Sequence, residues 1–198
     1  MPVRSSIVAL LMGLCLSIAL PSPAEPAAAA DGTTASPTGE PGTWRSQKTE
    51  LVYMGFTSTY SCDGLEAKLK LLLRQLGARP DFKVYSTGCD RDYGKPSRFA
   101  RATLEFATLQ PADAPADAPA GSAAVTGIWR PVELAPHHPF DLQDGDCELM
   151  EQFRDTVLPL FATRGLRVQI TCVPHQDTGG PFDLQLQVFA PPPAPKSK

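Results

Sequence analysis

Apolar residues recur at steps of three and four in one segment of the first half of the chain. They are Leu65, Leu69, Leu72, Leu73 and Leu76. This spacing places them on one face of a helix. Ser61 or Asp63 is suited to cap its first turn, because a short polar side chain accepts an unpaired backbone N–H there. Gly77 and Pro80 mark its end.

A second helical stripe lies closer to the C-terminus. It consists of Leu149 or Met150, followed by Phe153, Val157 and Leu160. Asp144 or Asp146 is the candidate cap. Pro159 removes a backbone hydrogen bond and clashes with the preceding turn, so we expect this helix to kink or end near Leu158. Gly165 closes the segment.

Strand patterns accompany each helix. They cover residues 49–56, 81–89, 98–109, 166–173 and 183–190. These segments are rich in apolar, aromatic and β-branched residues, as strands are. In the last one, apolar residues alternate with Gln185 and Gln187, which indicates a sheet with one buried face. Three of these segments belong to the first part of the chain and two to the second, and we expect both parts to follow the order strand, helix, strand, strand.

The two parts also match residue by residue, which predicts an internal duplication. At an offset of 85 positions the identical pairs are Trp44 with Trp129, Arg45 with Arg130, Cys62 with Cys147, Glu66 with Glu151 and Arg79 with Arg164. After the helix the offset becomes 83, and Cys89 matches Cys172 while Phe106 and Ala107 match Phe189 and Ala190. A repeat of this length is one supersecondary unit used twice.

The expected fold class is therefore α+β. Two strand-helix-strand-strand units, 44–109 and 127–190, would form a two-layer sandwich with an antiparallel sheet of about six strands and both helices on one face. Two small separate domains are the alternative. Residues 31–43, 110–126 and 191–198 are polar or rich in Pro and Ala, and we interpret them as a flexible tail, a linker and a disordered tail.

The N-terminus resembles an export signal. Arg4 precedes the apolar run "IVALLMGLCLSIAL", and small residues lead to a cleavage point that we place after Ala30. A retained N-terminal anchor is the alternative. We expect a periplasmic or secreted protein with no membrane span after cleavage of the 1–30 signal peptide. The net charge of −3, without a dense Lys/Arg run, argues against nucleic acid as a partner.

Four cysteines remain after export, and an even number in an exported chain favours disulfide bonds. They are Cys62, Cys89, Cys147 and Cys172. The C-x-x-C spacing typical of redox catalysis or of a zinc ribbon is absent from the sequence. Three connectivities are possible. If each unit was once autonomous, it had only its own two cysteines, so we pair Cys62 with Cys89 and Cys147 with Cys172.

The densest cluster of metal-ligand side chains surrounds His137, His138 and Asp141. Imidazole and carboxylate groups bind zinc or copper, but neighbouring strand residues point to opposite faces. No catalytic motif accompanies the cluster. The pattern therefore favours a binding or interaction module of the bacterial envelope, without a cofactor and with an unknown protein or envelope partner docked at a strand edge. A metal protein or enzyme using the histidine loop is the rival hypothesis.

Overall fold

The computed structural model describes residues 39–56, 58–89, 95–112, 124–173 and 181–193. The helices are α1 (Cys62–Gln75) and α2 (Cys147–Thr156), with short 3-10 helices η1 (Asp144–Asp146) and η2 (Leu158–Leu160). The strands are β1 (Glu40–Met54), β2 (Lys83–Thr87), β3 (Phe99–Pro111), β4 (Val125–Leu134), β5 (Thr163–Ile170) and β6 (Phe182–Ala190). Both parts of the chain therefore have the expected order of elements.

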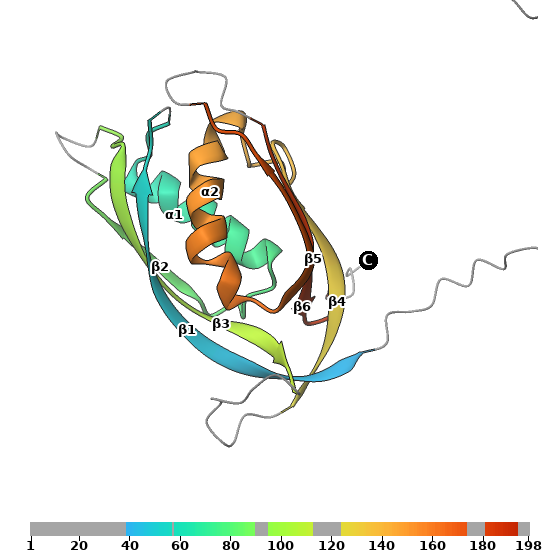
Figure 1. The fold of residues 1–198 in the computed structure, drawn as a ribbon. Coiled ribbons are helices and arrows are strands. Elements are labelled where there is room, and N and C mark those ends of the chain that lie inside the picture. The colour runs from blue at the N-terminus through green and yellow to red at the C-terminus, as the bar shows by residue number, and fades with distance from the viewer. Residues whose placement is uncertain (1–38, 57, 90–94, 113–123, 174–180, 194–198) are drawn as a thin grey trace, which may run out of the picture. The chain divides into compact units, whose positions relative to one another are not determined.

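The strands form one antiparallel six-stranded sheet in the order β2-β3-β1-β4-β6-β5. β1 and β4 join its two halves through a short ladder that pairs Glu40–Gly42 with Gly127, Thr126 and Val125. Past this junction the halves separate and curve around both helices (Figure 1). The α+β class, the six strands and the two helices are thus confirmed.

Among the residues that the structure describes, one apolar core lies between the helices and both halves of the sheet. It includes Leu51 and Leu104 from the first half and Phe153 and Leu184 from the second. Two independent small domains would each have a core of their own, so that alternative is wrong.

The first helix forms as the leucine spacing predicts. Ser61 is its N-cap, and its hydroxyl accepts a hydrogen bond from the Gly64 N–H at 3.1 Å. The stripe is buried: Leu65, Leu69, Leu72 and Leu73 are inaccessible to solvent. Gly77 follows the helix with a φ of 76°, a conformation that glycine adopts without steric cost.

The second helix is shorter, as Pro159 predicts. α2 ends at Thr156, and the chain continues as the 3-10 turn Leu158–Leu160, with the proline in its first positions. The second unit therefore has a ten-residue helix where the first has fourteen residues.

The expected boundaries of the units are too narrow. β1 starts at Glu40, inside the segment assigned to a flexible tail, because this stretch pairs with both β3 and β4. A Cβ at Gly42 would lie 2.7 Å from the Phe189 ring, so only glycine fits at this close crossing. β3 extends to Pro111 and β4 begins at Val125, so both reach into the expected linker.

The strand register corrects one pair of the residue-by-residue match between the two units, the pair Phe106 and Phe189. Trp44 lies opposite Leu109, whereas Trp129 lies opposite Phe189. Phe189 thus occupies the place of Leu109 and not that of Phe106. The duplication itself stays an interpretation, to which the mirrored strand order adds support.

Several expectations concern residues that the structure does not describe: the expected signal peptide (1–30), residues 31–38, the middle of the expected linker (113–123) and the chain end (194–198). None of the helices in the described part of the chain has the length and apolar character needed to cross a membrane.

Candidate functional site

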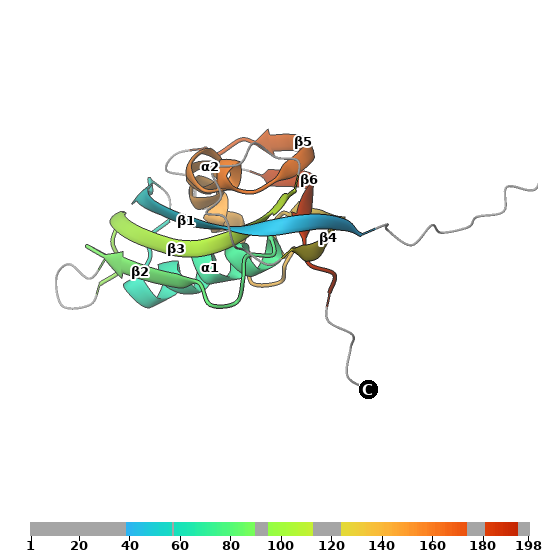
Figure 2. The same ribbon diagram turned by 90° about the horizontal axis from the view of Figure 1, so that it is seen from below.

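The two helices pack against different parts of the sheet. α1 packs against β2 of its own half, whereas α2 packs against β1 of the other half (Figure 2). The Gln152 side chain on α2 explains this contact. Its Oε1 accepts the Met54 N–H at 3.0 Å and its Nε2 donates to the Met54 carbonyl oxygen at 2.8 Å. The carboxamide thus takes the place of a neighbouring strand and closes the edge of β1.

A buried carboxylate fixes the start of α2 to the first half of the molecule. The Asp146 side chain is only 4% exposed. It accepts hydrogen bonds from the Tyr60 hydroxyl, from Lys68 Nζ at 2.7 Å and from the Gln143 N–H at 2.7 Å. Asp146 is therefore more than the helix cap that the sequence suggests, because two of its donors come from the other half.

Neighbouring polar groups extend this network. Glu148 accepts the Phe56 N–H at 2.9 Å, and the Tyr53 hydroxyl donates to the Ser58 carbonyl oxygen at 2.9 Å. Burial raises the pKa of Tyr60 above its ordinary value, and the Asp146 carboxylate raises it further. Burial also raises the pKa of Tyr53, with the Glu148 carboxylate as the second cause. Both phenols are neutral hydrogen-bond donors, which suits a structural junction.

The position of α2 leaves β5 uncovered. Val84 on β2 lies opposite Leu104, and under α1 it is only 3% exposed. Val168 holds the comparable position on β5, opposite Leu184, and is 41% exposed. Leu166 beside it is 45% exposed. Large apolar residues are thus open to solvent along an edge strand, which is typical of an interaction surface.

The outer face of β5 is basic. Arg164 and Arg167 lie opposite Gln187 and Gln185 of β6, with a bulge between the two arginines. Arg164 Nε donates to Gln187 at 2.7 Å, and its guanidinium lies 4.3 Å from the centre of the Trp129 ring. The two arginines and the two glutamines border a shallow hollow of about 500 Å³. We name β5 and this hollow the β5 edge site.

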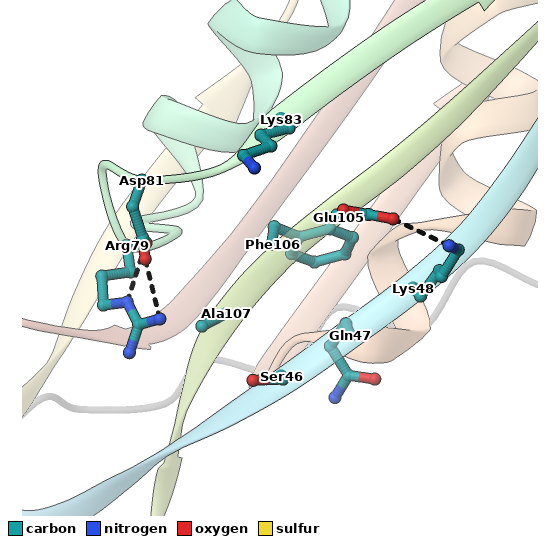
Figure 3. Close-up of a pocket in the computed structure, with 9 residues that line it drawn as sticks. All are labelled: Ser46, Gln47, Lys48, Arg79, Asp81, Lys83, Glu105, Phe106 and Ala107. Atoms are coloured by element: carbon teal, nitrogen blue, oxygen red, sulfur yellow. Dashed lines mark hydrogen bonds and ion pairs between the residues drawn. The ribbon is translucent and has the colours of Figure 1, made fainter.

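A second hollow, of about 360 Å³, lies over β1, β3 and the start of β2 (Figure 3). Lys48 bonds Glu105 at 2.7 Å and Arg79 bonds Asp81 at 2.7 Å. Lys83 lies between these pairs (Figure 3). The Lys48 hydrogen bond lowers the pKa of Glu105, and the Arg79 hydrogen bond lowers that of Asp81. Its carboxylates and bases largely neutralise one another, so this hollow offers little net charge to a ligand.

Both predicted disulfides are present in the structure. Cys62 bonds Cys89 with an S–S distance of 1.96 Å, and Cys147 bonds Cys172 at 2.07 Å. Each joins the start of a helix to the segment after the following strand. Bonded in this way, the four sulfurs are not available as thiolate nucleophiles or metal ligands.

The loop that carries His137 and His138 lies between β4 and η1, whereas the β5 edge site is formed by residues later in the chain. His137 and His138 are exposed, and His137 adopts a positive φ of 64°. The backbone of His138 bridges to Ala135. Asp141 is exposed, and its carbonyl oxygen accepts from Lys68. Within the described ranges, no three histidine, cysteine or acidic side chains come close enough to hold a metal ion.

No pattern in the sequence marks the most important contacts of the site. Asp146, Tyr60 and Lys68 are far apart in the chain, and nothing in their spacing marks them as partners. One pattern in the sequence does relate to the site: Arg79 and Arg164, which occupy matching positions in the two units, make the same kind of contact. Each guanidinium lies over the tryptophan of its own half, Arg79 at 5.9 Å from the Trp44 ring centre.

The fold and the site define a disulfide-bonded α+β protein with an open sheet edge. No family model matches the chain, and no curated protein or solved structure shows significant similarity to it.

Proposed function

We propose that this protein is an exported, non-enzymatic binding module that docks a protein partner by strand addition at the β5 edge site. The observation that carries the proposal is the exposure of β5 at the end of the sheet, where Leu166 and Val168 are open to solvent. In strand addition, main-chain hydrogen bonds supply affinity and alternate side chains supply specificity.

The other strand edges are less suited to this role. Gln152 closes the end of β1, as described above. β2 is the opposite edge of the sheet, but it has five residues where β5 has eight. It also lies against α1, which covers Val84. β5 is thus the longer edge, and its Val168 is far more exposed than the comparable Val84 of β2.

The disulfides support the exported location. Two bonded cysteine pairs fit an oxidising compartment such as the periplasm or the extracellular space. We propose that the partner belongs to this compartment or to the envelope.

Site-specific photo-crosslinking tests the proposed docking surface. A photoreactive amino acid replaces Val168 on β5 or, as the matched control, Tyr85 on β2, which is 53% exposed. In cells that express the exported protein, we expect a discrete crosslinked product from position 168 and not from position 85. Equal products from both positions, or none from position 168, would refute docking at β5.

A further inference from the structure

The charges beside β5 indicate what kind of strand would dock there, an inference that rests on the proposed function. In the first half of the sheet, outward basic side chains pair with acids across strands. Lys48 bonds Glu105 at 2.7 Å, and Arg101 bonds Glu50 at 2.6 Å. Opposite charges on facing strands stabilise a sheet, and like charges destabilise it.

The second half lacks such acids opposite its edge arginines. Arg164 and Arg167 face the amides of Gln187 and Gln185. Gln185 Nε2 in turn donates to Asp183 at 3.0 Å. Within the described residues neither arginine forms an ion pair. The positive charge of these two arginines is therefore available to an acidic group outside the sheet.

This charge also selects among possible occupants. If β5 of a second copy were added in antiparallel orientation, arginines of both copies would gather on one face of the joined sheet, and their repulsion would oppose pairing. An acidic strand would instead gain two charge-assisted contacts. The bulge and the positive charge thus protect the edge from self-association and leave it open to an acidic partner.

We infer that the β5 edge site binds an extended segment of a partner in which two acidic residues flank an apolar one. The bulge lets Arg164 and Arg167 lie opposite Gln187 and Gln185, which are two positions apart on β6. Acids with the same spacing on the added strand share one face, and the residue between them points to the other. There it meets the side of the sheet that carries the exposed Val168.

Peptide binding to the oxidised protein tests this inference. The probe is a fluorescein-labelled ten-residue peptide of alternating glutamate and valine, and its control carries glutamine in place of glutamate. Fluorescence anisotropy at low salt measures both. The R164Q/R167Q variant is compared with K48Q/R101Q, which removes the same number of positive charges from the first half of the sheet. Circular dichroism and intact disulfides verify that both variants are folded.

We expect the glutamate peptide to bind more tightly than the glutamine peptide. R164Q/R167Q should lose about fivefold in affinity for the glutamate peptide, from two cross-strand charge pairs. K48Q/R101Q should change less than about twofold, as exposed charges remote from the ligand do.

Three results would overturn the inference: equal binding of the two peptides, no binding of either, or equal losses in the two variants. If the acidic preference fails while position 168 still forms its crosslinked product, docking at β5 stands and only the partner's chemistry is wrong. Dimers in sedimentation velocity that a Val168→Asp substitution abolishes would show that the edge binds a second copy instead.

Discussion

Replacement of Asp146 by alanine should strongly destabilise the protein, because its carboxylate joins the two halves. The side chain is 4% exposed and accepts from Tyr60, Lys68 and the backbone of Gln143. Its removal leaves the buried Tyr60 phenol and the partly buried Gln143 N–H without this acceptor. It also leaves the ammonium group of Lys68 without its acid.

The magnitude follows from these three donors. Breaking a buried ion pair by removal of one partner costs about 3 to 5 kcal/mol, and an unsatisfied buried donor costs about 1 to 3 kcal/mol. The Lys68 side chain is 19% exposed and also donates to the Asp141 carbonyl oxygen, which limits its share. We therefore expect a loss of about 3 kcal/mol in the free energy of unfolding.

Urea denaturation of the oxidised protein, followed by circular dichroism, measures this loss. Asp155→Ala on the same helix is the matched control, because Asp155 pairs with Arg154 at the surface with its side chain 60% exposed. The control should lose less than about 1 kcal/mol. A loss below about 1 kcal/mol for Asp146→Ala would show that this carboxylate does not hold the two halves together.

Three further predictions concern the bridges, the phenols and the closed edge. Replacement of Cys62 and Cys89 by serine should lower stability by roughly 3 to 4 kcal/mol in chemical denaturation, because the bridge spans 27 positions; an unchanged midpoint would contradict this. Tyr53 and Tyr60 have raised pKa values in the folded protein, so their phenols ionise at lower pH in the unfolded chain. Their contribution to the free energy of unfolding should therefore be fully present below pH about 10 and fall as the pH rises above it. A denaturation midpoint that stays constant between pH 9 and pH 11, on the order of one unit either side of the phenol pKa, would argue against neutral buried phenols. Gln152→Ala should cost about 1 kcal/mol and speed amide exchange at the end of β1, whereas unchanged exchange there would show that the side chain does not close this edge.

Local patterns were enough to predict α1, α2 and the strands β1, β2, β3, β5 and β6, whereas no strand pattern was assigned to the residues of β4. The leucine stripe, Ser61 and Pro159 act within a few residues of their own positions, so their consequences for α1 and α2 follow from helix geometry. The pairing of Cys62 with Cys89 also followed, because a unit that was once autonomous had only its own two cysteines to join.

Contacts between the two units could not be predicted in this way. Tyr60 and Asp146 meet only after the chain has folded, and neither residue type carries a local signal for the other. The exposure of Val168 depends on where α2 packs, which is a property of the whole core. The strand boundaries failed for a related reason, since Gly42 and its neighbours are ordered by pairing with distant strands.

β5 is open because α2 packs against β1, and we propose that a partner closes it. Hydrogen–deuterium exchange of β5 measures this closure, on the free protein and on the complex recovered from its own compartment. We expect rapid exchange in free β5, slower exchange in β6, and strong protection of β5 in the complex. Unchanged exchange in β5, with protection instead around the outer hollow beside Lys48, would show that the partner docks elsewhere.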